Sequence, residues 1–266
     1  MNIKAKKKYG QNFLKDESIK QRIIQAMPND NLKVVEIGPG LGDLTKKLLE
    51  QNKIVTAFEI DLELCDYLQD SLKSDIESQQ LSLVCKDVLE CWDDSLHNEN
   101  YHLIANLPYY VATNIILKAL GDSKCKSLLV MIQKEVALKF SAKAGDKEFS
   151  SLSILASLVG KSELLFDVGG ECFDPPPKVT SSILKIEKIR DYICDELFKD
   201  EDEFESFKKF LKTAFIAPRK VLIKNLQRSF DKDGIKEFFD KKGLSYTLRP
   251  HQLSVEDYHL LFKNLK

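Results

Sequence analysis

Between residues 32 and 133, short apolar segments typical of buried strands alternate with segments whose apolar residues recur at helical spacing. This alternation constrains the fold strongly, because parallel strands must be joined by long crossovers, which are usually helices. The expected strands cover residues 32–37, 54–60, 81–87, 101–107 and 127–133. The expected helices cover residues 18–27, 41–51, 63–72, 112–120, 134–142 and 150–159. The pattern predicts an α/β domain with a mostly parallel sheet that is covered on both faces.

The pattern changes toward the end of the chain. Strands are expected at 163–168 and 181–188 with no helix between them, which favours an antiparallel hairpin at one edge of the sheet. The intervening "ECFDPPPKVT" has three prolines, so we expect no regular structure there. Beyond Lys188 only helices are expected, at 203–215, 219–230, 234–243 and 254–265. We therefore predict one domain over 1–190 and a small all-helical domain over 191–266.

Composition excludes several classes of protein. No apolar run approaches the roughly 20 residues of a membrane span, and the basic N-terminus precedes no apolar segment typical of a secretory signal. The six cysteines lack C-x-x-C spacing and do not cluster with the four histidines, so we expect free thiols and no metal site. These observations predict a cytoplasmic protein without a membrane partner, and we expect a monomer.

Basic residues are unevenly distributed, although the net charge is only −1. Residues 1–8 hold four lysines and no acid, and residues 206–228 hold seven basic residues and no acid. A polyanion such as RNA would meet two basic patches, although each patch can also be an ordinary solvated surface. The candidate phosphate contacts in the second patch are Lys208, Lys212, Arg219, Lys220 and Lys224.

The segment "VVEIGPGLGDLT" (34–45) places glycines between the first buried strand of this series and a helix. Such a loop lets the backbone approach a ligand closely. Gly38 and Gly40 fit this role, but Asp43 stands where a dinucleotide fingerprint requires its third glycine. The loop therefore favours S-adenosylmethionine, which has no pyrophosphate, over a nicotinamide dinucleotide. A tight turn without a ligand remains an alternative.

Acidic residues follow the next two strands. Glu59 lies 19 residues after Gly40, where a carboxylate can accept hydrogen bonds from both ribose hydroxyls of a nucleoside. Asp61 is expected to cap the next helix. Asp87 can contact an adenine amine or cap a helix, and the sequence does not separate these two roles. Because ligands bind at the carboxyl ends of parallel strands, these residues support a cofactor site.

The segment "NLPYY" (106–110) follows the fourth strand. Asn106 offers a side-chain carbonyl and is also a candidate cofactor contact. Pro108 keeps Leu107 extended so that its backbone carbonyl can point away from the sheet. Tyr109 offers a ring for stacking. Two acceptors and a ring form a clamp for a planar base with an amino group, which must be unstacked from its neighbours to enter.

Together these motifs resemble the ribosomal RNA adenine N6-dimethyltransferases, specifically the bacterial small-subunit dimethyladenosine transferases. The matching segments are "KKKYGQNFL" (6–14), "VEIGPGLGDLT" (35–45), "FEID" (58–61), "NLPYY" (106–110) and "FDPPPKVTSSI" (173–183). The resemblance implies a Rossmann-like methyltransferase fold, S-adenosylmethionine as cofactor, and dimethylation of two adjacent adenosines near the 3′ end of 16S rRNA. It also implies that Gln11, Asn12 and Leu14 close over the cofactor. Phe173 would stack on the target base opposite Tyr109.

The second domain resembles the family less closely, because Pro218, His251 and Gln252 depart from its usual pattern. Three alternative functions remain. The first-domain motifs also suit a large-subunit rRNA methyltransferase that confers antibiotic resistance. A nicotinamide oxidoreductase is disfavoured by Asp43. A largely non-catalytic, RNA-binding ribosome assembly factor is disfavoured by the intact "NLPYY".

Overall fold

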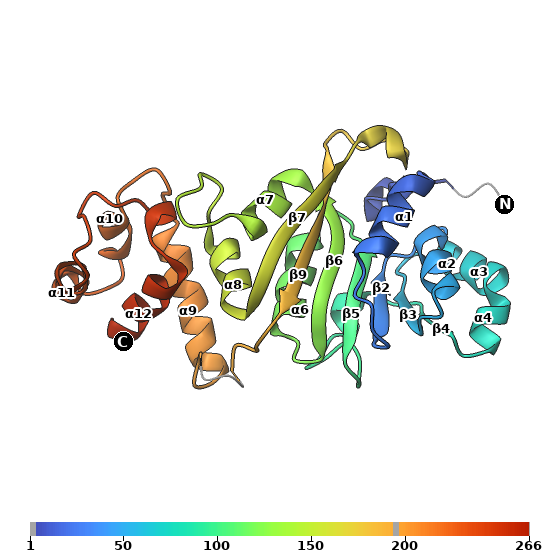
Figure 1. Cartoon of the computed structure of the whole chain (residues 1–266), viewed down its shortest axis with the longest axis horizontal. Helices are drawn as coiled ribbons and strands as arrows, with labels where there is room; N and C mark the ends of the chain where they lie inside the picture. Colours follow the sequence, from blue (N-terminus) through green and yellow to red (C-terminus); the bar gives the residue numbers. More distant parts are fainter. Residues whose placement is uncertain (1–3, 194–196, 266) are drawn as a thin grey trace. The chain divides into compact units, whose positions relative to one another are not determined.

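The computed structural model describes residues 4–193 and 197–265. Its main sheet has seven strands in the order β4-β3-β2-β5-β6-β9-β7 (Figure 1). The strands are β2 (Lys33–Ile37), β3 (Val55–Phe58), β4 (Leu81–Val84), β5 (Tyr101–Asn106), β6 (Cys125–Gln133), β7 (Gly160–Val168) and β9 (Ser181–Lys188). The first five in spatial order are parallel, and β9 runs antiparallel to β6. The predicted α/β class and the mostly parallel sheet are confirmed.

Helices occupy the segments between these strands. They are α1 (Glu17–Ala26), α2 (Asp43–Glu50), α3 (Leu62–Ser71), α4 (Lys73–Glu77), α5 (Val88–Cys91) and α6 (Ala112–Gly121). In Figure 1, α1 lies in front of the sheet and α6 behind it. The short helices α4 and α5 were not expected, because four or five residues are too few to display helical periodicity.

Two short strands join the N-terminal segment to the proline-rich loop. β1 (Phe13–Leu14) pairs antiparallel with β8 (Phe173–Asp174). Each is preceded by a short 3-10 helix, at Lys7–Tyr9 and Gly170–Cys172. The expectation of no regular structure in 171–180 is wrong over residues 171–174, because Glu171 and Cys172 belong to a 3-10 helix and Phe173 and Asp174 pair with β1 before the prolines begin.

The chain divides into two compact units. The sheet unit comprises Met1–Ala137 and Ser162–Ile189, and the helical unit comprises Leu138–Lys161 and Arg190–Lys266. The second junction lies next to the predicted boundary at residue 190. Residues 138–161, which we expected in the first domain, instead belong to the helical unit. The roles expected of the two domains stay predictions.

The remaining helices have an aromatic core. They are α7 (Lys134–Ser141), α8 (Ser151–Val159), α9 (Glu201–Ala214), α10 (Leu222–Leu226), α11 (Lys232–Lys242), the 3-10 helix Pro250–Gln252 and α12 (Val255–Asn264). Rings from α9 and α12 meet in this core, with the centroids of Phe207 and Phe262 5.2 Å apart. Helix α10 is shorter than the expected 219–230. The buried Asn225 amide donates to the carbonyls of Ala214 and Ala217, which secures α10 beside the end of α9.

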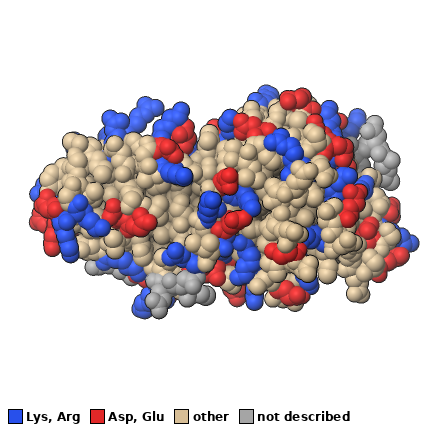
Figure 2. Space-filling view, in the orientation of Figure 1, with Lys and Arg blue, Asp and Glu red and all other residues tan. Residues whose placement is uncertain are grey.

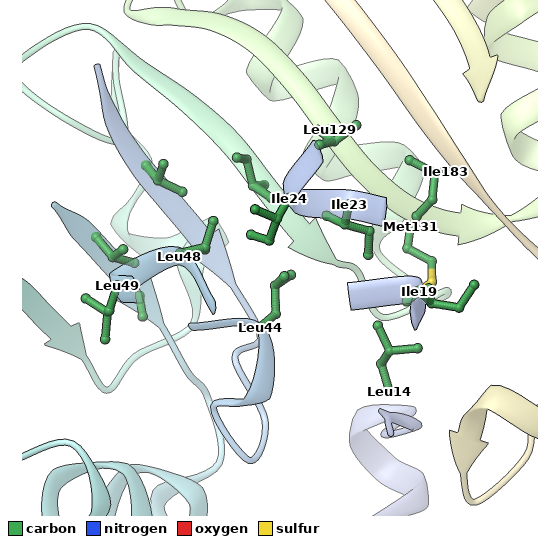
Figure 3. Packing of buried hydrophobic residues seen from close by; sticks show 14 of the residues in the cluster. Leu14, Ile19, Ile23, Ile24, Leu44, Leu48, Leu49, Leu129, Met131 and Ile183 are labelled. Atoms are coloured by element: carbon green, nitrogen blue, oxygen red, sulfur yellow. The ribbon is translucent and has the colours of Figure 1, made fainter. Parts of the chain in front are cut away.

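Helix α1 contributes to the core of the sheet unit. Its side chains Ile23 and Ile24 lie between leucines of α2, including Leu48, and Leu129 and Met131 of β6 (Figure 3). Asp16 caps this helix by accepting a hydrogen bond from the Ile19 amide. This packing holds the beginning of α1, and the strand β1 before it, against the carboxyl edge of the sheet.

The cysteines differ from expectation at one pair. Cys65 and Cys85 form a disulfide, with their Cα atoms 6.0 Å apart. The prediction of free thiols is wrong for this pair, because α3 and the end of β4 bring the two residues within the span of a disulfide. Cys91, Cys125 and Cys172 are free, and Cys194 lies outside the described residues.

Within residues 4–193 and 197–265, no helix is both long enough and apolar enough to cross a bilayer. Nor do three or more His, Cys, Asp or Glu side chains gather there in a way that suits a metal ion.

Candidate active site

One cavity of the sheet unit lies at the carboxyl ends of β2, β3 and β5. It is lined by residues 9–14, 36–41, 43–44, 58–60, 64, 86–89, 106–111 and 115. All the residues predicted to bind the cofactor line it, namely Gln11, Asn12, Leu14, Gly38, Gly40, Glu59, Asp87 and Asn106. Leu107 and Tyr109 line it as well. The cofactor motifs and "NLPYY" thus share one cavity, as the convergence of parallel strand ends leads us to expect.

Gly40 shows why the loop after β2 needs glycine. Its φ angle of +60° lies in the left-handed region, which side chains other than glycine rarely adopt. A Cβ atom there would also lie 3.0 Å from the ring of Phe13. The loop is therefore packed closely against the N-terminal segment, and its backbone remains exposed to the cavity.

Glu59 is buried, with 4% of its surface exposed, and its carboxylate is fixed by three backbone amides. Oε1 accepts hydrogen bonds from Ile60 (3.0 Å) and Asp61 (2.9 Å), and Oε2 accepts one from Gly40 (3.3 Å). Burial raises the pKa of Glu59, while these hydrogen bonds oppose the rise. A carboxylate has about four acceptor positions, so it retains capacity for a ribose hydroxyl.

Glu36 lies next to this group on β2 and is fully buried. The hydroxyl of Thr45 donates a hydrogen bond of 2.7 Å to its Oε2. Burial raises the pKa of Glu36 to about 8, and the neighbouring charge of Glu59 adds to the rise. At neutral pH the Glu36 carboxyl is therefore mostly protonated.

Two aspartates cap helices, as the sequence suggested. Asp61 accepts a hydrogen bond from the Glu63 amide at the start of α3, and Asp87 accepts one from the Leu89 amide at the start of α5. Asp61 also contacts Lys6 and Gln11, which sequence reasoning did not foresee. The contact of Asp87 with an adenine amine stays a prediction.

Asn106 ends β5, and its amide nitrogen donates a hydrogen bond of 3.1 Å to the backbone carbonyl of Asn12. Since only the NH₂ side can donate to a carbonyl, this contact assigns the opposite side of the amide to the oxygen. Within the described residues, neither Asn106 Oδ1 nor the Leu107 carbonyl accepts a protein hydrogen bond. Two acceptors thus remain available beside the cavity.

Tyr109 is half-buried, and its hydroxyl lies 2.7 Å from the hydroxyl of Ser181 on β9. Burial raises the pKa of Tyr109, so the phenol stays neutral. Ser181 anchors the ring at its far end, and Tyr109 lines the cavity. Sequence reasoning missed this residue, although it belongs to the quoted segment "FDPPPKVTSSI".

Phe173 differs from the other predicted site residues. Its side chain is 1% exposed and belongs to the hydrophobic core of the sheet unit, and its backbone pairs with Leu14. Stacking of this ring on a base would require it to leave the core, so its role stays a prediction. Tyr110, by contrast, lines the cavity and is 63% exposed.

The candidate RNA contacts lie in the helical unit. Lys212, Arg219, Lys220 and Lys224 are exposed, whereas Lys208 pairs with Glu205 and lies 4.8 Å from the ring centroid of Phe204. In Figure 2, basic side chains of this unit gather along its upper edge. The four exposed residues therefore suit phosphate contacts better than Lys208 does.

Comparison with known proteins identifies relatives over nearly the whole chain. Residues 2–266 match the family described as "Ribosomal RNA adenine dimethylase". A protein of Campylobacter concisus, "Ribosomal RNA small subunit methyltransferase A", is 55% identical and covers 99% of this chain and 95% of its own. A relative of the same name from Aliarcobacter butzleri is 51% identical and covers 99% of this chain and 97% of its own.

Two solved structures share the fold. The 23S rRNA methyltransferase ErmE has a TM-score of 0.72 at 23% identity, covering 96% of this chain and 99% of its own. A dimethyladenosine transferase from Plasmodium falciparum has a TM-score of 0.71 at 23% identity, covering 94% of this chain and 95% of its own. At this level of identity the two structures support the methyltransferase fold alone.

Proposed function

The chain belongs to the ribosomal RNA adenine dimethylase family, and from this premise we propose that it dimethylates N6 of two adjacent adenosines near the 3′ end of 16S rRNA. It is an rRNA adenine dimethyltransferase that uses S-adenosylmethionine. The observation that carries the proposal is the single cavity containing both Glu59, suited to a nucleoside ribose, and Asn106, suited to an amine.

The residues present fit the cofactor. S-adenosylmethionine supplies a methyl group on a sulfonium, which is already a good leaving group. Glu59 would accept hydrogen bonds from the ribose hydroxyls, and Gly40 would let the backbone approach. Gln11, Asn12 and Leu14 would cover the site from the N-terminal segment. Positioning supplies most of the rate acceleration in such a reaction.

In the same cavity, Asn106 Oδ1 and the Leu107 carbonyl would accept the two N–H bonds of the target amine. This arrangement turns the nitrogen lone pair toward the methyl group. Tyr109, whose hydroxyl is engaged by Ser181, would hold the base flat. None of these groups is a strong base, and we propose that the proton leaves to water after transfer.

Mass spectrometry of rRNA tests the choice of substrate directly. Cells that lack this protein should lose the dimethyladenosines near the 3′ end of 16S rRNA and regain them with the wild-type gene. Loss of a modification in 23S rRNA would instead indicate the large-subunit alternative. Unchanged rRNA would favour a binding factor without turnover.

Tyr109 should act through its ring more than through its hydroxyl. Tyr109→Ala loses base stacking worth about 1–3 kcal/mol, so methyl transfer should fall about 5- to 150-fold. Tyr109→Phe retains the ring and loses only the contact with Ser181, so much of the activity should remain. Single-turnover rates with saturating small subunits provide the measurement. Equal losses in the two variants would contradict the stacking role.

The exposed basic residues of the helical unit should contribute to RNA affinity. Arg219→Ala combined with Lys224→Ala should weaken RNA binding. It should also reduce the slope of log affinity against log salt concentration by roughly one per lost phosphate contact. A matched control removes Lys73 and Lys124, which are exposed lysines of the sheet unit. Filter binding at several salt concentrations measures both slopes. If the two double variants have the same slope as the wild type, this surface is merely solvated.

A further inference from the structure

The N-terminal strap, defined here as residues 6–14, is fastened to the sheet unit at both of its ends. At its start, Lys6 Nζ lies 2.7 Å from Asp61 Oδ1 and 2.7 Å from Glu63 Oε2. At its end, β1 pairs with β8. Residues 9–14 between these points line the cavity. The strap therefore forms one wall of the site, and its position depends on contacts with residues distant in sequence.

Gln11 completes a cluster around Asp61, which we call the latch (Lys6, Gln11 and Asp61). Its amide donates a hydrogen bond of 3.0 Å to Asp61 Oδ2, and its Oε1 accepts one of 2.7 Å from the Lys6 backbone amide. Both oxygens of Asp61 thus hold the strap. The Asp61 side chain is only 4% exposed, so its pairing with Lys6 is less screened by water than an ordinary surface ion pair.

The latch is connected to the reacting side of the cavity through the next residue. Asn12 follows Gln11 directly, and its carbonyl receives the hydrogen bond from Asn106. The Asn12 side chain in turn donates to the carbonyl of Gly10, which stiffens this part of the strap. The last torsion of an asparagine is otherwise soft, with two broad orientations that exchange the oxygen and the NH₂ group.

We propose that Lys6 is a positioning residue for methyl transfer. The latch holds the Asn12 carbonyl in place, and this carbonyl selects the orientation of Asn106 in which Oδ1 faces the target amine. In the opposite orientation an NH₂ group would meet the amine and repel its N–H bonds. The inference rests on the proposed role of Asn106 as the acceptor, and it adds that a lysine outside the cavity maintains that role.

The test compares three variants. Lys6→Met removes the charge but keeps most of the side-chain length, and the single-turnover rate should fall about tenfold, as expected when a reacting group is misplaced. Lys6→Arg keeps the ion pair and should restore most of the rate. Lys124→Met removes the same charge from an exposed lysine elsewhere in the sheet unit and should stay within about twofold of wild type. RNA affinity should be similar in Lys6→Met and Lys124→Met.

Two further measurements separate positioning from other causes. Hydrogen exchange should increase in peptides covering residues 6–14 of Lys6→Met but not in the central strands. In an Asn106→Ala background, Lys6→Met should cause little additional loss of rate, because its effect passes through that amide. An unchanged exchange rate in the strap, or an equal loss in both backgrounds, would overturn the proposal.

The controls also distinguish this proposal from the proposed function. If Asn106→Ala is slow while Lys6→Met is as fast as wild type, only the latch is wrong. If Asn106→Ala itself methylates at the wild-type rate, the acceptor role of Asn106 fails, and the latch proposal fails with it.

Discussion

Asn106→Ala is expected to slow methyl transfer by about 10²- to 10³-fold, the loss typical of removing one preorganised polar group from a transition state. The variant removes the acceptor that aligns the lone pair of the amine. This alignment matters most in the transition state, so cofactor and rRNA should still bind with nearly unchanged affinity. Single-turnover methylation of small subunits, together with calorimetry for cofactor affinity, provides the measurement.

A matched control for this prediction is Asn114→Ala. Asn114 is an exposed asparagine of α6 that does not line the cavity, so its loss should leave the rate within about twofold of wild type. Wild-type turnover in Asn106→Ala would contradict the clamp. A large loss of cofactor affinity would instead assign Asn106 to the cofactor.

Glu59→Ala should weaken S-adenosylmethionine binding by more than tenfold, and by about a hundredfold if both ribose hydroxyls bind the carboxylate. Each hydrogen bond to a charged group contributes about 1.5–3 kcal/mol. Calorimetry measures the affinity, and thermal unfolding checks that the fold remains. Glu90→Ala is the control, because Glu90 is an exposed acid of α5 beside the cavity but not in its lining. Equal affinity in wild type and Glu59→Ala would remove Glu59 from the site.

The same residue predicts a pH dependence of binding. Burial raises the pKa of Glu59, and the ionised carboxylate accepts a hydrogen bond from a ribose hydroxyl more strongly than the protonated carboxyl does. Cofactor affinity should therefore fall as the pH decreases, beginning at a higher pH than for an ordinary glutamate. In Glu59→Gln this part of the pH dependence should disappear. Its persistence in that variant would assign it to another group.

Local sequence signals predicted most of the sheet unit. The apolar strand before Gly38, the glycine loop and the following helix match β2 and α2 closely, because each depends on neighbouring residues. The placement of Glu59 and Asn106 beside one cavity was predicted too. This placement follows because residues at the carboxyl ends of neighbouring parallel strands meet at the same edge of the sheet.

Other features were not predictable from local patterns. The placement of 138–161 in the helical unit depends on packing between helices that are distant in sequence. The packing of α10 beside the end of α9 depends on the Asn225 side chain and its acceptors, the carbonyls of Ala214 and Ala217. Phe173 precedes three prolines, and its expected stacking on a base would need an accessible ring. Pairing of its strand with β1 instead places the ring in the core.

Local sequence patterns were sufficient for the order of strands and helices along the chain, the loop at Gly40 and the acidic and amide side chains at the strand ends. The hydrogen bonds and ion pairs that fix these side chains depend on the tertiary fold. Lys6 reaches Asp61 across 55 positions, and Ser181 reaches Tyr109 across 72. Such contacts arise where distant segments cross, and a single hydrogen bond leaves no periodic trace in the sequence. The physical reason is that periodicity records burial along one element, whereas orientation of a catalytic group depends on partners contributed by another.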